Sequence, residues 1–159
     1  MELFNKSGAL IALVLVMVGA LIACQAKEDG LPPAADIEAV AHRLGEHGGA
    51  AAERRLHEWA EQGSVVAKRE LGMLYQSKTM QRHEAMRLFE EAARAGDSES
   101  AFQLAEMYQA GSAAPSKAWP LYAQAAERHH RKATQRLAAL ARGGSEEAAR
   151  WLAGAERLK

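Results

Sequence analysis

The large and small apolar positions of this chain repeat with a step of 33 residues between Ala52 and Ala141. Large side chains recur as large ones and small side chains as small ones, in the sets Leu71, Leu104, Leu137; Gly72, Ala105, Ala138; Leu56, Phe89, Tyr122; and Ala60, Ala93, Ala126. A fixed period of this length is typical of stacked helix pairs, because one pair cannot bury its apolar face alone. The pattern therefore predicts an all-α fold, a short right-handed α-solenoid of about four antiparallel helix pairs.

Helical spacing and end signals predict where these helices lie. Asp36 is a suitable N-cap for the first helix. Further helices are expected at 50–62, 65–75, 82–95, 98–109, 116–128, 131–142 and from Ser145 onward. Pro120 would remove a helical hydrogen bond, so its helix is expected either to begin late, near Ala118, or to kink there. Gly63 and Gly96 suit the left-handed turn that closes a helix.

The chain begins with an apolar run from Ala9 to Ala23. At about 15 residues it is shorter than the roughly 20 that a membrane-spanning helix needs, and it suits the apolar region of a secretory signal. The run ends in Leu21-Ile22-Ala23-Cys24, which resembles the lipobox of bacterial lipoproteins. This resemblance implies a signal peptide at 1–23 and a lipidated tether at 24–35, and the 33-residue pattern predicts a repeat domain at 36–159. The alternative is a plain signal peptide or an uncleaved anchor with an incidental cysteine.

Cys24 is the only cysteine, which excludes an internal disulfide framework. In lipoproteins of this kind the cysteine sulfur receives a diacylglycerol and the new amino terminus is acylated. Three acyl chains would anchor the protein far more firmly than one. Because Gln25 rather than an aspartate follows the cysteine, the chain is similar to lipoproteins of the outer membrane. The resemblance implies a lipid anchor on the periplasmic side of a bacterial membrane.

A second resemblance covers roughly residues 41–141. It rests on two similar stretches and on an Ala-x-x-Gly ending: Leu71-Gly72-Met73-Leu74-Tyr75 with Ala92-Ala93 and Gly96, Leu104-Ala105-Glu106-Met107-Tyr108 with Ala125-Ala126, and Ala60-Glu61-Gln62-Gly63. These features resemble the Sel-one-like repeat, a relative of the tetratricopeptide repeat. The spacing is a few residues shorter than is usual in that family, and His129 stands where the closing glycine is expected.

The repeat resemblance implies an adaptor that holds a protein partner in a cell-envelope assembly. If the first helix of each pair lines the partner face, the binding residues are Arg69, Met73, Gln76, Phe102, Glu106, Gln109, Gln135 and Arg136. In an alternative interpretation, Met73 and Phe102 belong to the core and the other side chains are only solvated. A small regulatory or inhibitory lipoprotein acting on one envelope enzyme would use the same surface.

Charge adds one feature to this picture. The formal net charge is zero, with 20 basic and 20 acidic residues, which argues against a nucleic-acid surface. The stretch from Asp36 to Gly63 contains six acidic and three basic residues, whereas the stretch from Glu127 to Lys159 contains eight basic and four acidic residues. The repeat domain is therefore expected to have an acidic front and a basic tail, which could orient a partner.

Catalytic motifs are not recognisable in the sequence. Some proteins with Sel-one-like repeats are linked to cell-wall or β-lactam chemistry, but those are built on cysteine pairs. The chain has no serine elbow, phosphate-binding glycine loop or paired carboxylates, so it is not expected to be an enzyme or to need a cofactor. His129 and His130 are adjacent, whereas two metal ligands on one helix face need a spacing of three or four, so no metal site is expected.

Overall fold

The computed structural model describes residues 30–111 and 115–157. The chain divides into two compact units, Met1–Pro32 and Pro33–Lys159, and every described helix belongs to the second. The described residues form eight α-helices and no strand, so the prediction of an all-α fold is confirmed. The apolar run, Cys24 and most of the predicted tether lie outside the described residues. None of the described helices is long and apolar enough to cross a membrane.

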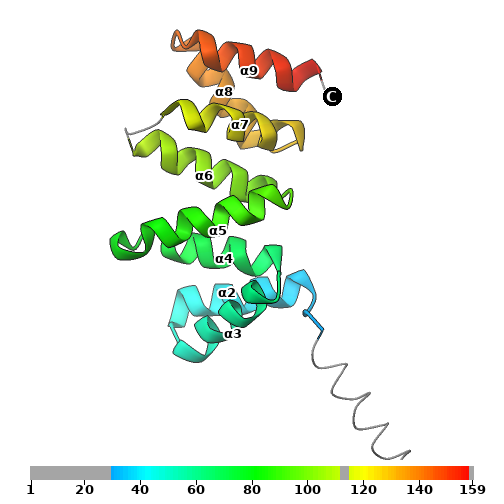
Figure 1. Cartoon of the computed structure of the whole chain (residues 1–159), viewed down its shortest axis with the longest axis vertical. Coiled ribbons are helices and arrows are strands. Elements are labelled where there is room, and N and C mark those ends of the chain that lie inside the picture. Colours follow the sequence, from blue (N-terminus) through cyan, green and yellow to red (C-terminus); the bar gives the residue numbers. More distant parts are fainter. Residues whose placement is uncertain (1–29, 112–114, 158–159) are drawn as a thin grey trace, which may run out of the picture. The chain divides into compact units, whose positions relative to one another are not determined.

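The helices follow one another in chain order through the second unit, from cyan to red in Figure 1. Their bounds are α2 Ala34–His47, α3 Ala50–Glu61, α4 Val65–Tyr75, α5 Arg82–Arg94, α6 Ser98–Ala110, α7 Ala118–Glu127, α8 Arg131–Arg142 and α9 Glu146–Arg157. Short 3₁₀ helices, Thr79–Gln81 and Pro115–Lys117, precede α5 and α7. Apart from the start of α2, these bounds match the sequence-based ranges to within one or two residues, and α7 begins at Ala118, one of the two outcomes expected from Pro120.

The start of α2 differs from the prediction. The helix begins at Ala34, with Pro33 as its N-cap, so Asp36 lies in the first turn and is not the cap. Proline can stand here because the first backbone nitrogens of a helix have no intrahelical partner, and the carbonyl oxygen of Pro33 accepts the N–H of Asp36 at 3.0 Å and of Ile37 at 3.3 Å. The last two residues of the predicted tether are therefore helical.

Three turns between helices share one construction at the 33-residue step. Each places a residue at positive φ, Gly63 (95°), Gly96 (98°) and His129 (62°), as the left-handed closing turn requires. The next residue caps the following helix: the side chains of Ser64, Asp97 and His130 accept a hydrogen bond from the backbone N–H three positions later, at 3.2, 2.8 and 3.2 Å. Each of these turns therefore ends one helix and starts the next.

Each helix packs against the next one along the chain, and α2 also contacts α4 while α7 contacts α9. The N-terminal core contains mostly large side chains, including Leu56, Leu71 and Phe89. The C-terminal core contains mostly alanine around Trp119, Tyr122 and Leu137. Both cores meet at α6, where the partly buried Tyr108 packs against each.

Candidate functional site

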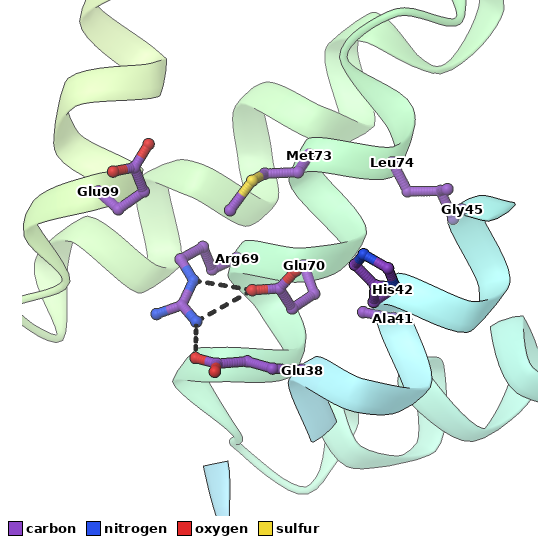
Figure 2. A pocket seen from close by; sticks show the side chains of 9 residues that line it. All are labelled: Glu38, Ala41, His42, Gly45, Arg69, Glu70, Met73, Leu74 and Glu99. Carbon is purple, nitrogen blue, oxygen red and sulfur yellow. Dashed lines mark hydrogen bonds and ion pairs between the residues drawn. The ribbon is translucent and has the colours of Figure 1, made fainter. Parts of the chain in front are cut away.

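A cleft of about 680 Å³ lies between α2 and α4 and reaches the start of α6. One face of α2 contributes residues spaced three and four apart, which is the spacing that brings side chains to the same side of a helix. The lining is Glu38, Ala41, His42 and Gly45 from α2, Arg69, Glu70, Met73 and Leu74 from α4, and Glu99 from α6. Figure 2 shows the charged side chains at one end of this cleft and the apolar ones beside them.

Arg69 is the centre of the charged end. Its guanidinium contacts three carboxylates: Nη2 lies 2.5 Å from Glu38 Oε1, Nε lies 3.0 Å from Glu70 Oε1, and Nη1 lies 3.2 Å from Asp97 Oδ1. The contacts with Glu38 and Glu70 are drawn in Figure 2. The Arg69 side chain is 15% exposed, so most of it is removed from water. One cation therefore joins α2, α4 and the N-cap of α6.

The pKa values of Arg69 and Glu70 are both raised, but for different reasons. Burial alone would lower the pKa of Arg69, but its hydrogen bonds and the charges of Asp97, Glu70 and Glu38 raise it. For Glu70 burial raises the pKa, and the charges of Glu38 and Asp97 add to that effect despite the contact with Arg69. Arg69 is therefore well satisfied as a cation, whereas burial and the neighbouring acids disfavour the charged form of Glu70.

The residues predicted to bind a partner are spread over several environments. Arg69 and Met73 lie together in the cleft. Glu106 accepts hydrogen bonds from Tyr122 Oη at 2.6 Å and from Arg136 Nε at 3.0 Å, which ties α6 to α7 and α8. Among the eight predicted residues, the structure thus brings Arg69 close to Met73 and Glu106 close to Arg136.

The remaining predicted residues lie elsewhere. Phe102 is half-buried against the C-terminal core and its ring stacks on His130, with the ring centres 4.8 Å apart. Gln76 follows directly after α4, and Gln135 is exposed beside a small hollow near His129. The side-chain amide oxygen of Gln109, Oε1, is buried and has no hydrogen-bond partner among the described residues.

Sequence reasoning missed the acids that surround Arg69. Asp97 could have been found, since Ser64, Asp97 and His130 follow the same 33-residue step as Gly63, Gly96 and His129 before them. Glu38 gives no such signal, because the link between α2 and α3 is short and breaks the period. Glu70 looks like an ordinary neighbour of Arg69 until the packing of α2 on α4 is known.

A second polar group lies where α8 begins. His130 Nδ1 accepts the N–H of Ala133, so the ring proton is on Nε2, which donates to Glu99 Oε2 at 2.9 Å. Burial would raise the pKa of Glu99, but hydrogen bonds from His130 and Gln103 outweigh it and lower that pKa. This arrangement fixes α8 on α6. Within residues 30–111 and 115–157, no group of three or more His, Cys, Asp or Glu side chains is placed to hold a metal ion.

Comparison with models of protein families, with curated proteins and with solved structures finds no match to this chain. Its function therefore has to be inferred from its own residues and from the geometry in which the described part of the chain places them.

Proposed function

We propose that this chain is a lipid-anchored adaptor in a bacterial cell envelope, which holds a protein partner against the cleft between α2 and α4. The observation that carries this proposal is the cleft itself, which places an apolar wall beside half-buried charges. Surfaces that bind proteins combine these two features, because the apolar part supplies affinity and the charges supply specificity. Binding rather than catalysis is the role we assign to it.

Two further features support an adaptor. The 33-residue step and the repeated capped turns favour a short α-solenoid of antiparallel, Sel-one-like helix pairs, an architecture that offers an extended face to a partner. The lipobox-like Leu21-Ile22-Ala23-Cys24 favours attachment to the periplasmic side of a membrane, the outer membrane in our proposal. On this basis the tether positions the repeat domain beside the lipid surface.

The anchor is tested by metabolic labelling with palmitate. The wild-type chain is expected to incorporate the label, and Cys24→Ala is expected to lose both the label and the wild-type processing. Equal labelling of the two proteins would contradict lipidation at Cys24.

The docking role is tested by crosslinking in the native host and purification through a carboxyl-terminal tag. Met73→Gln is expected to reduce the crosslinked partners, because Met73 lines the cleft. Met80→Gln is the matched control, because Met80 is 96% exposed and does not line the cleft. Equal capture by both variants and by the wild type would place the partner elsewhere and reject the cleft as the docking site.

A further inference from the structure

The charges in the cleft between α2 and α4 do not balance. Three acids line it, Glu38, Glu70 and Glu99, and Arg69 is the one arginine or lysine among its lining residues. Arg69 is shared further with Asp97 at the N-cap of α6, 3.2 Å away, and Glu70 is poorly hydrated, since its side chain is 16% exposed. Like charges held close together in a place of reduced solvation repel one another, and an added cation relieves that repulsion.

The depth of the acids in the cleft fits a long side chain. Glu38 lies at the rim with its side chain 52% exposed, whereas Glu70 lies deeper. Ala41, Met73 and Leu74 form the apolar wall beside them. Lysine and arginine have an aliphatic stem that packs on apolar surface while the charged end reaches an acid. A small hydrated cation would leave this wall unused.

A second copy of this chain could not freely offer two of the basic side chains of α8, because they are already used within their own chain. Arg136 Nε contacts Glu106 at 3.0 Å, and the charge of Lys132 helps to lower the pKa of Glu99. Inserting them into the cleft would first break these interactions.

We propose that the cleft binds a segment of a partner protein in which a lysine or arginine stands beside aliphatic residues. The basic side chain passes Glu38 and pairs with Glu70, and the aliphatic neighbours contact Met73 and Leu74. This inference rests on the proposed docking function and adds the chemistry of the partner.

The experiment selects binders from a random library of displayed 12-residue peptides, on the full chain kept in a non-ionic detergent. Selected peptides are expected to be enriched in lysine or arginine next to leucine, isoleucine, valine or methionine. A synthetic peptide from the selection is expected to bind the Glu38→Gln/Glu70→Gln variant about tenfold more weakly, and binding should weaken with added salt. Circular dichroism and thermal unfolding check that this variant is folded.

The matched control is Glu58→Gln/Glu90→Gln. It removes the same number of acids, each of which contacts an arginine of its own helix outside the cleft, and the exposed fractions of their side chains, 49% and 48%, are close to the 52% of Glu38. This control is expected to bind the peptide as the wild type does. A loss of affinity equal to that of the cleft variant would mean that general charge attraction explains the binding, and the proposal would be wrong.

Two other outcomes would overturn the inference in distinguishable ways. Selected peptides without basic residues that still lose affinity on Met73→Gln would leave the docking function standing and reject the basic partner. Peptides that bind every variant equally would reject the cleft as a docking site altogether. Sedimentation supplies the remaining check, because a wild-type dimer that dissociates on Glu70→Gln would make a second copy the occupant.

Discussion

At the scale of single residues, Ser100 departs from its repeat. Its counterparts at the 33-residue step are Ala67 and Ala133, and all three side chains are fully buried. The Ser100 hydroxyl has no hydrogen-bond partner among the described residues. A buried polar group without a partner destabilises the folded state by about 1–3 kcal/mol.

We therefore predict that Ser100→Ala raises the free energy of unfolding by about 1 kcal/mol. The backbone N–H of residue 100 keeps its bond to Asp97, so the cap of α6 is unchanged. Urea denaturation of the two proteins measures the difference. A destabilised variant would show that the hydroxyl has a partner after all.

Glycine at a positive φ and glycine inside a helix should respond oppositely to the same substitution. Gly63→Ala places a Cβ at φ 95° and should destabilise the protein by about 1–2 kcal/mol. Gly45→Ala, inside α2 with no atom within 4 Å of the new Cβ, should stabilise it by about 0.5–1 kcal/mol. Thermal unfolding measures both, and shifts of the same sign would contradict this assignment.

His129→Gly should stabilise the folded protein, because it relieves the left-handed strain at φ 62°.

Glu70 should make stability depend on pH. Its pKa is raised in the folded state, so the folded protein binds the proton more readily than the unfolded one. The free energy of unfolding therefore falls as pH rises through the interval from 4.5 to the raised value. Glu70→Gln should be more stable than the wild type above this interval and equal to it below. Denaturation at a series of pH values tests this, and a constant difference would contradict it.

At the scale of elements, the close approach of α4 and α5 depends on Gly72. A Cβ at that position would lie 2.6 Å from the Phe89 ring, which is fully buried. The corresponding pair in the next repeat is Ala105 and Tyr122. The close spacing of α4 and α5 therefore requires a residue without a Cβ at position 72.

Gly72→Ala should therefore destabilise by about 1–3 kcal/mol, although alanine favours helix more than glycine does. Adding Phe89→Leu should recover part of that loss, because a smaller side chain makes room for the methyl group. A double-mutant cycle in urea measures the coupling. Additive effects of the two substitutions would show that the ring moves away freely.

Most element boundaries could be predicted from the sequence because their signals are local. The helix starts at Val65 and Arg131 and the late start at Ala118 follow from glycine, proline and apolar spacing. The cleft could not be predicted, because Glu38 and Arg69 are far apart in the chain and meet only through the packing of α2 on α4. The environment of Phe102 could not be predicted either, because its stacking on His130 depends on that histidine capping α8.

At the scale of the whole unit Pro33–Lys159, the two cores differ in composition. Ten of the thirteen buried residues in the C-terminal core are alanine, against three of twelve in the N-terminal core. Burying a leucine or phenylalanine contributes about 1.5–3 kcal/mol, and an alanine contributes much less. A chain in which each helix contacts mainly the helices next to it can open from one end.

We predict that amides of α8 and α9 exchange hydrogen faster than those of α4 and α5. Hydrogen exchange followed by mass spectrometry would resolve these helices. Leu137→Ala should speed exchange in α8 and α9 before it affects α4, because Leu137 belongs to the C-terminal core. Uniform protection from α2 to α9 would instead indicate a single cooperative unit.

The turns at Gly63, Gly96 and His129 also bear on how such a chain can change its length. A segment of the type 64–96 carries its own starting cap and its own closing turn, so it is a self-contained building block. Duplication of that segment within the gene would add one helix pair without creating a new kind of junction. The cleft between α2 and α4 and the C-terminal helices α8 and α9 would then lie one helix pair further apart along the chain.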